Sequence, residues 1–313
     1  MGFFYILENK VKKFTSCVIF LANLLEKLLK SFNQTEKNRH MKIALIYFSG
    51  TGVTAKFATD IARGFIKENH TVDLLRIKRN AKLDLVSYDI IGIGAPVYSY
   101  RAPRIVSNFL RKLDLHKRPF FVFSTSGGVP GNTLWNLYHA VYRKAGVFLG
   151  SIEGYGTTNI RSWMPKITDT HQRLSGLTKH DCEMALAFAE TVLERQTRWK
   201  TTPDKGEMKS LIPDSNLWYY IWAGLFTWRF MMAFYVGIKF VNKEKCNNCK
   251  LCATRICPSK AISLNKKNQP RFNEFLCVGC SGCVNLCPED AIWTFRSRNH
   301  IQYNLYKDYI LEG

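Results

Sequence analysis

The arrangement of the cysteines is the feature that most constrains how this chain can fold. Eight of the ten cysteines fall within residues 246–287, where they form two rows of four. In each row two residues separate the first three cysteines from one another, and proline follows the fourth. Thiolates in such tight loops are the ligands that suit iron–sulfur clusters and zinc. The rows are Cys246-x2-Cys249-x2-Cys252-x4-Cys257-Pro258 and Cys277-x2-Cys280-x2-Cys283-x3-Cys287-Pro288.

The spacing of both rows resembles that of bacterial-type ferredoxins, which hold two [4Fe–4S] clusters. In that family three closely spaced cysteines bind one cluster, and the cysteine before proline crosses to the other cluster. The resemblance implies two ligand sets of four cysteines each. These sets are Cys246, Cys249, Cys252 and Cys287 for one cluster, and Cys277, Cys280, Cys283 and Cys257 for the other.

The first row departs from the ferredoxin pattern in one respect. Four residues, Ala253 to Ile256, separate Cys252 from Cys257, where the pattern has three. A bulge in a short helix would absorb the extra residue, because a π-helical turn holds one residue more than an α-helical turn. The departure therefore leaves open whether Cys257 is a ligand.

A zinc ribbon and a disulfide framework are the alternatives for the cysteine-rich segment. Zinc ribbons pair C-x2-C units without a third cysteine two residues later and without the Cys-Pro end. A disulfide framework belongs to small secreted chains in oxidising compartments, and the rest of this 313-residue chain does not have that character. The two-cluster interpretation fits the spacing better than either alternative.

Residues 41–200 alternate between apolar strand patterns and amphipathic helix patterns. The predicted strands are Lys42–Phe48, Thr71–Ile77, Tyr88–Gly94, Arg118–Thr125 and Phe148–Gly154. The predicted helices are Val53–Lys67, Pro103–Leu113, Asn132–Ala145 and His171–Arg198. Strands that alternate with helices form a parallel sheet covered on both faces. The sequence thus predicts an α/β fold with a doubly wound parallel sheet of five strands, followed by a small α+β cluster domain.

The loop after the first predicted strand, Ser49–Thr54, has the composition of a phosphate site. It opens a helix, so a phosphate there would meet free amide donors and the positive end of the helix dipole. Its glycines allow the backbone to approach a ligand closely. No lysine follows in the Gly-Lys-Ser/Thr form, which excludes a nucleoside triphosphate loop.

Two further loops follow the third and fourth predicted strands. In a doubly wound sheet these two loops and Ser49–Thr54 all lie at the carboxyl edge, where ligands bind. In order and spacing they resemble the loops of flavodoxins. The resemblance implies that Ser49–Thr54 hold the FMN phosphate, while Ala95–Tyr100 and Ser124–Gly128 flank the isoalloxazine ring. It also makes Tyr98 the candidate for stacking on that ring. The candidate FMN-binding residues are Ser49, Gly50, Thr51, Gly52, Val53, Thr54, Ala95, Pro96, Val97, Tyr98, Ser99, Tyr100, Ser124, Thr125, Ser126, Gly127 and Gly128.

The combination resembles the flavodoxin–ferredoxin fusion family of anaerobic microbes, from Met41 to the second cysteine row. The resemblance includes Thr158-Asn159-Ile160 before the last helix of the first half and Phe240-Val241 before the first row. It implies a low-potential electron-transfer protein that passes electrons between FMN and two [4Fe–4S] clusters and on to a partner redox protein. The alternative is a flavin-dependent oxidoreductase that acts directly on a small molecule such as a quinone or a porphyrinogen.

The chain is expected to divide into an N-terminal extension (1–40), a flavodoxin-like domain (41–200), a linker with an aromatic helical segment (201–240) and a ferredoxin domain (241–313). Residues 217–240 contain ten aromatic side chains. We expect this segment to pack as a helix between the two cofactor domains, because they must approach closely for electrons to pass. Trp218, Trp222 and Phe226 would form the packing row, since residues four apart share a helix face.

The net charge of +21 bears on the choice of partner. No block of consecutive lysine and arginine residues and no nucleic-acid motif accompanies this charge, so nucleic acid is not the expected partner. A positively charged surface steers the approach of a negatively charged protein. We therefore expect an acidic redox protein as the partner.

Residues 1–40 include a short apolar run, Phe14–Leu25. It is shorter than the ~20 residues that a spanning helix needs. Leucines that share one helical face make an amphipathic surface helix one interpretation, and an appended extension is the other. Cluster proteins are generally assembled inside cells, so the expected location is cytoplasmic, with association at a membrane surface as the alternative.

Overall fold

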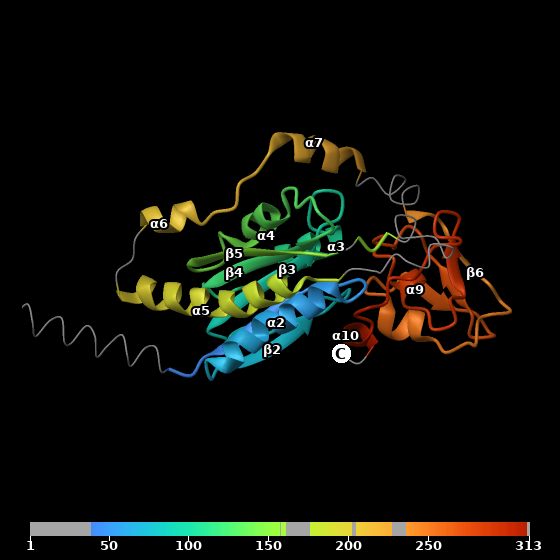
Figure 1. Ribbon diagram of the computed structural model, residues 1–313, viewed down its shortest axis with the longest axis horizontal. Helices are drawn as coiled ribbons and strands as arrows, with labels where there is room; N and C mark the ends of the chain where they lie inside the picture. Colours follow the sequence, from blue (N-terminus) through green and yellow to red (C-terminus); the bar gives the residue numbers. More distant parts are fainter. Residues whose placement is uncertain (1–38, 157, 161–175, 202–204, 227–235, 312–313) are drawn as a thin grey trace, which may run out of the picture.

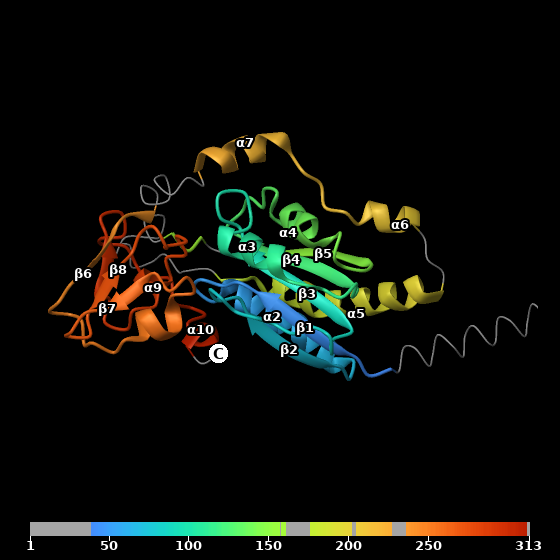
Figure 2. The same cartoon turned by 180° about the vertical axis from the view of Figure 1, so that it is seen from behind.

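A computed structural model describes residues 39–156, 158–160, 176–201, 205–226 and 236–311 of the chain. Figure 1 shows two parts side by side: a larger one in which helices cover a sheet, and a smaller one of short strands, turns and short helices. The larger part is built from the blue to yellow segments and the smaller one from the orange and red segments. Figure 2 shows the same arrangement from behind.

The larger part contains one five-stranded parallel sheet in the order β2-β1-β3-β4-β5. The chain runs from β1 outward to β2 and then crosses to β3 on the other side of β1. This reversal puts the loops after β1 and β3 next to each other at the carboxyl edge, and the prediction of a doubly wound sheet is confirmed. The strands are β1 (Lys42–Tyr47), β2 (Thr71–Arg76), β3 (Ile90–Pro96), β4 (Phe120–Ser126) and β5 (Phe148–Tyr155).

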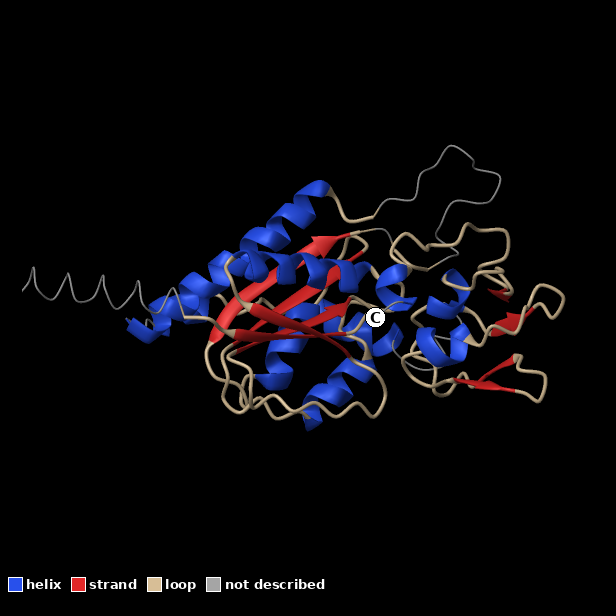
Figure 3. Cartoon of the chain, turned by 90° about the horizontal axis from the view of Figure 1, so that it is seen from below, coloured by secondary structure: helices blue, strands red, loops and turns tan. Residues whose placement is uncertain are grey.

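Helices cover both faces of the sheet, as Figure 3 shows from below. Along β1, Ala44 and Ile46 face one core together with α3 and α4, whereas Ile43 and Leu45 face a second core together with α2 and α5. Burial on both faces is the reason that the strands read as continuous apolar runs. The helices are α2 (Val53–Lys67), α3 (Arg104–Lys112), α4 (Thr133–Val141) and α5 (Lys179–Thr201).

The predicted helix Val53–Lys67 is confirmed with those bounds. The predicted helix His171–Arg198 begins too early, although residues 171–175 lie outside the described part of the chain. The helix begins at Lys179 because Thr178 caps it: the Asp181 amide donates to Thr178 Oγ1 at 3.1 Å, and the Thr178 amide donates to Asp181 Oδ2 at 2.9 Å. This reciprocal pair is a capping box, which fixes the first turn.

The smaller part is built on two short antiparallel strand pairs, β6 with β9 and β7 with β8. Its helical elements are brief, and α10 lies beside α2 of the larger part in both Figure 1 and Figure 2. Buried Ile256, Val284 and Ile292 belong to one compact core. The elements are β6 (Lys239–Val241), η2 (Cys252–Ile256), β7 (Ile262–Leu264), β8 (Pro270–Phe272), α9 (Gly282–Asn285), β9 (Ile292–Thr294) and α10 (Asp308–Leu311).

The aromatic segment differs from the prediction. After α6 (Lys205–Ser210), it forms α7 (Leu217–Phe226), while Phe240 belongs to strand β6. Trp218 is 67% exposed and Trp222 is 46% exposed, so the expected tryptophan seam between the domains is wrong at both positions. The side chain of Phe226 lies outside the described part of the chain.

Two tyrosines of α7 make ring contacts with the flavodoxin-like part of the molecule. The Tyr219 ring stacks on Tyr100 with 5.2 Å between centroids, and the Tyr220 ring meets Trp135 edge-on at 5.5 Å. The helix therefore lies over the larger part, near α4 in Figure 1, with both tryptophan side chains partly exposed. Within the described residues, none of the helices has both the length and the apolar character needed to cross a membrane.

Gly64 is required where α2 crosses α5. A Cβ added there would lie 2.3 Å from the carbonyl oxygen of Leu186 and 2.7 Å from the Cβ of Ala189. We expect Gly64→Ala to lower the free energy of unfolding by about 1–3 kcal/mol, because overpacking outweighs the gain in helix propensity of ~1 kcal/mol. Urea unfolding followed by circular dichroism measures this change.

Gly224→Ala in α7 is the matched control, because no described atom lies within 4 Å of a Cβ added at Gly224. This substitution should leave stability unchanged or slightly raised. Equal losses in the two variants would show that the crossing of α2 and α5 does not need a glycine.

Candidate functional site

The loop between β1 and α2 forms a buried, uncapped helix start. Gly52 adopts a φ of 104° at the N-cap, and its amide donates to Ser49 Oγ at 3.1 Å. No side chain in the described part of the chain caps the first turn of α2. Ser49, Thr51 and Thr54 are buried. Amides left without partners at a buried helix end need an acceptor, and a phosphate group supplies one.

The loops after β1, β3 and β4 line one cavity at the carboxyl edge of the sheet. The segment after β5 adds Thr158 and Asn159 to its wall. Of the candidate FMN residues, those that line the cavity are Ser49, Gly50, Thr51, Val53, Thr54, Pro96, Val97, Tyr98, Thr125, Ser126 and Gly127. The donors and the glycines of this cavity fit FMN, with the phosphate at the start of α2.

The remaining six candidates lie beside this cavity rather than in its wall. Ala95 and Ser124 are buried within β3 and β4. Tyr100 stacks on Tyr219 of α7 instead of facing the loops. The other three are Gly52, Ser99 and Gly128.

The loops after β1, β3 and β4 are the candidate site for FMN, and we call them the FMN loops. Tyr98 belongs to the loop after β3 and lies where these loops meet the smaller part of the molecule. Its ring meets Phe48 edge-on with 6.2 Å between centroids. A Cβ added at Gly50 would lie 2.8 Å from the Tyr98 hydroxyl oxygen and 2.8 Å from the Cβ of Cys280. The pKa of Tyr98 is well above its ordinary value. Burial is the main cause, and the nearby Cys280 raises the pKa further. The phenol is therefore neutral and packs tightly at this junction.

The structure gathers the eight spaced cysteines around two small cavities. One cavity is lined by Cys257, Cys277, Cys280 and Cys283, which we call the inner cysteine set. The other is lined by Cys246, Cys249, Cys252 and Cys287, which we call the outer cysteine set. These are the two groups that the ferredoxin resemblance implies, and four thiols around one opening fit a cubane cluster.

The described cysteines are free thiols rather than disulfides. Among the described residues, no three His, Cys, Asp or Glu side chains converge as ligands of a single metal ion. Burial raises the pKa of Cys252 to about 11 and that of Cys280 to about 12. Binding iron would therefore have to release protons from these buried thiols, as metal–thiolate bonding does.

A π-helical turn absorbs the extra residue of the first cysteine row. In η2 the Cys257 amide donates to the Cys252 carbonyl at 3.1 Å, five residues back. In the second row the Leu286 amide donates to Gly282 at 2.8 Å, four residues back. The turn brings Cys257 to the wall of the inner cavity in spite of the longer spacing.

Lys239 is a buried cation beside the inner cysteine set. Its side chain is 4% exposed and forms an ion pair with Glu274 at 2.7 Å. Burial lowers the pKa of Lys239, but Cys277, Glu274 and Cys283 outweigh burial and raise it above its ordinary value. The ammonium group is thus charged and would offset the negative charge of a thiolate-bound cluster.

Arg76 at the end of β2 ties the phosphate loop to the inner cysteine set. Its guanidinium donates to the Ser49 carbonyl at 3.1 Å on one side. On the other side it donates to the carbonyls of Arg255 and Ile256 at 3.4 Å, in the turn that precedes Cys257. One side chain therefore fixes the FMN loop against the π-helical turn.

Two asparagines extend this junction. Asn159, after β5, donates to the Cys280 carbonyl at 3.2 Å. Asn285 of α9 donates to the Asn159 carbonyl at 2.8 Å. These bonds couple the segment after β5 to the loop that carries the second cysteine row.

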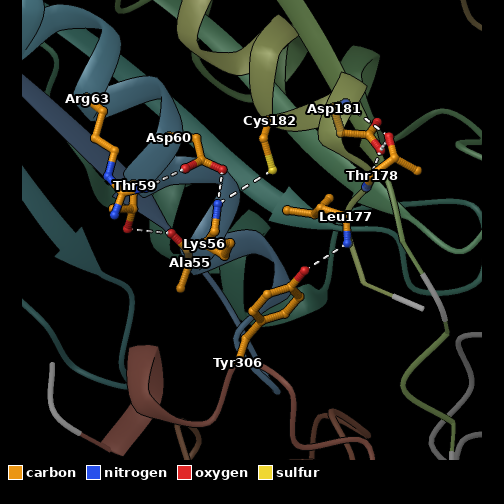
Figure 4. A network of polar contacts seen from close by, with 10 residues as sticks. All are labelled: Ala55, Lys56, Thr59, Asp60, Arg63, Leu177, Thr178, Asp181, Cys182 and Tyr306. Carbon is orange, nitrogen blue, oxygen red and sulfur yellow. Dashed lines mark hydrogen bonds and ion pairs between the residues drawn. The ribbon is translucent and has the colours of Figure 1, made fainter. Parts of the chain in front are cut away.

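Tyr306, near the C-terminus, closes the far side of the junction. Its carbonyl oxygen would lie 2.0 Å from a Cβ added at Gly52, so no larger residue fits at that N-cap without movement. Its hydroxyl accepts a hydrogen bond from the Leu177 amide at 2.9 Å. Figure 4 shows the hydrogen bond between Tyr306 and Leu177. Cys182 lies nearby, and its sulfur accepts a hydrogen bond from the Lys56 ammonium group at 3.6 Å.

Comparison with known proteins agrees with this geometry. Residues 44–152 match the family model described as a flavodoxin domain, and residues 245–292 match the model described as a 4Fe-4S dicluster domain. The chain joins a flavodoxin domain to a 4Fe-4S dicluster domain. This pairing indicates a role in electron transfer or oxidoreduction, with FMN and [4Fe–4S] clusters as the cofactors that such domains carry.

Two relatives match the chain over short stretches. The chain is 41% identical over 52 residues to the indolepyruvate oxidoreductase subunit IorA of Pyrococcus horikoshii, covering 16% of this chain and 8% of that protein. It is 40% identical over 52 residues to the pyruvate synthase subunit PorD of Thermotoga maritima, covering 17% of this chain and 52% of that protein. The chain thus spans about half of one relative and much less of the other.

Solved structures resemble the flavodoxin domain. A flavodoxin from the domain Archaea shares 15% identity, with a TM-score of 0.40, over 50% of this chain and 99% of its own. Oxidised flavodoxin 2 from Bacillus cereus shares 18% identity, with a TM-score of 0.39, over 49% of this chain and 99% of its own.

The sequence missed several residues of the junction. Arg76 ends β2, so the rule that identified the three loops at the carboxyl edge could also have found it. Asn159 follows β5 and belongs to the run Thr158-Asn159-Ile160 noted above, but its bond to the second cysteine row was not predicted. No position at the end of a parallel strand marks Lys239, Asn285 or Tyr306. They reach the site only because the dicluster domain docks on the flavodoxin domain.

The π-helical turn predicts that Cys257 is needed for cluster binding. We expect Cys257→Ala to lower the bound iron and acid-labile sulfide by about half, because a cluster left with three protein ligands is labile. Iron and sulfide analysis after anaerobic purification measures this loss. Cys182→Ala is the control, since Cys182 lies on α5 outside both cysteine sets. Full iron content in both variants would show that Cys257 is not a ligand.

Proposed function

We propose that the chain is a low-potential electron-transfer protein that passes electrons between FMN and two [4Fe–4S] clusters and on to a partner redox protein. When bound, FMN accepts two electrons and each cluster accepts one, so the groups together join two-electron to one-electron chemistry. The phosphate loop with its neighbouring loops would hold FMN. The inner and outer cysteine sets would each hold one cluster.

The observation that carries this proposal is the direct contact between the FMN loops and the inner cysteine set. Gly50 and Tyr98 pack against Cys280. Arg76 bonds to the phosphate loop and to the turn before Cys257. Electron transfer slows steeply with distance, so packing of this kind between two cofactor sites favours exchange within one chain.

The outer cysteine set supports an exit to a partner. Cys280 and Cys283 of the inner set are buried, whereas Cys249 of the outer set is exposed. The order of burial suggests a path from the FMN loops through the inner set to the surface at Cys249. Exposed Lys245 and Lys250 flank that cysteine, and they favour an acidic partner.

A test of the proposal follows the electrons within the chain. In anaerobic solution, photoreduction of the bound flavin should be followed by loss of the cluster absorbance. Cys257→Ala should slow or abolish this second phase, because it removes a side chain of the inner cysteine set and leaves the FMN loops unchanged. If dithionite reduces the clusters of the intact chain but the reduced flavin does not, the proposal is contradicted.

The second prediction of this proposal concerns the docking of an acidic one-electron carrier at the outer cysteine set. We expect Lys245→Glu with Lys250→Glu to slow electron delivery to an acidic ferredoxin about tenfold at low salt, because steering raises association rates by at least that factor. The effect should fade in about 0.5 M salt, where screening is strong. Stopped-flow measurement of ferredoxin reduction gives both rates.

The control pair is Lys67→Glu with Lys200→Glu, which makes the same change in charge. These lysines lie in the last turns of α2 and α5, at the end of the flavodoxin domain remote from the dicluster domain in Figure 1. Equal slowing by both pairs would mean that only the total charge matters. No slowing by either would remove the docking role of the outer face.

A flavin-dependent oxidoreductase that acts on a small molecule is the second candidate function. The exposed loop after β4 favours it, because Gly127, Gly128 and Val129 leave the ring side of the FMN loops open to solvent. A quinone that reoxidises the reduced flavin as fast in Cys257→Ala as in the intact chain would support this candidate over the carrier.

A further inference from the structure

A large cavity lies at the junction of the two domains, outside the sites described above. Its volume is about 950 Å³, at the upper end of the range for small-molecule pockets. Three segments bound it: the loop at residues 78–83 after β2, helix α3, and residues 275–278 before the second cysteine row. Both domains contribute walls, so the cavity exists only when they are docked.

The walls of this junction cavity combine an apolar floor with a basic rim. The floor side chains are Leu83, Ile105, Phe109, Leu113, Leu276 and Val278. The rim cations are Lys78, Arg79, Lys82, Arg104 and Lys112. In the described part of the chain none of these five forms an ion pair. Asp114 is the one acidic residue among the described lining, so the five cations outnumber it.

The junction cavity also borders both redox sites. Tyr98 lines this cavity and the FMN-loop cavity. Cys277 lines this cavity and the cavity of the inner cysteine set. A molecule seated here would touch a wall of each site without occupying either of them.

We propose that the junction cavity binds an amphipathic organic anion, with an apolar body on the floor and a carboxylate or phosphate group at the rim. A neutral ligand would leave five neighbouring cations without a counter-charge, and a cationic ligand would be repelled. Residues 1–38 and 161–175 of this chain carry more lysine and arginine than acidic residues. The charge of the rim therefore argues against either segment as the occupant.

Decanoate is the probe, with decyltrimethylammonium as the matched ligand of the same chain length and opposite charge. Both are titrated below their micelle concentrations into the full-length protein with its cofactors, by isothermal titration calorimetry. We expect saturable binding of decanoate at one site, and binding of the cation at least tenfold weaker. Absence of saturable decanoate binding, or equal affinity for the two ligands, overturns the proposal.

Variants of the rim and of the far wall locate the bound probe. Lys82→Glu with Arg104→Glu should weaken decanoate binding at least tenfold, whereas the control pair Lys67→Glu with Lys200→Glu should leave it unchanged. Phe275→Ser removes an exposed side chain that the dicluster domain contributes to the cavity, and it should weaken binding several-fold without disturbing the fold. Unchanged affinity in the rim pair and in Phe275→Ser would place the probe elsewhere and overturn the proposal.

A spectroscopic readout separates this site from binding at exposed apolar side chains such as those of α7. Because Cys277 lines the cavity, decanoate should change the electron paramagnetic resonance spectrum of the reduced inner cluster. The change should saturate at the same concentration as the heat signal and disappear in the rim variant. A spectrum that stays constant while decanoate saturates would show that the probe does not reach Cys277.

Discussion

The contact between the phosphate loop and the turn before Cys257 is the interaction on which the rest of the structure depends. Arg76 makes it by donating to the Ser49 carbonyl on one side and to the Arg255 and Ile256 carbonyls on the other. Removal of the half-buried Arg76 side chain would therefore remove hydrogen bonds on both sides of this contact at once. This side chain therefore sets how closely the FMN loops approach the inner cysteine set.

Two cations, Lys239 and Arg76, lie near the inner cysteine set. Lys239 is held by Glu274 and lies close to Cys277 and Cys283. Breaking a buried pair by removal of one partner is strongly destabilising, because it leaves an isolated charge. Arg76 is a second cation close to this set, through Cys280 and Cys257. The inner set would therefore hold its cluster in a more positive environment than the outer set, where Cys249 faces solvent. Local charge and exposure are among the factors that tune cluster potentials.

Much of the fold follows from the sequence, and the failures have identifiable causes. Helix α2 was predicted to the residue because its apolar period and the glycine turn before it agree. The predicted start of α5 is too early, because the capping box at Thr178 begins the helix at Lys179. The buried seam predicted for the tryptophans of α7 rests on their spacing and on the expected approach of the two cofactor domains. Spacing identifies a helix face, but the packing partners Tyr100 and Trp135 decide which face is buried.

The sequence by itself determined the two domains and the three loops at the sheet edge, and it supplied the hypothesis for how the cysteines group. These features depend on the spacing of residues within short segments of the chain. Only the tertiary structure decided that a π-helical turn brings Cys257 to the inner set, and that Arg76, Asn159 and Tyr306 join the domains. The junction cavity likewise depends on the docked domains. Its walls come from segments far apart along the chain, and no local pattern of residues encodes which distant surfaces will pack together.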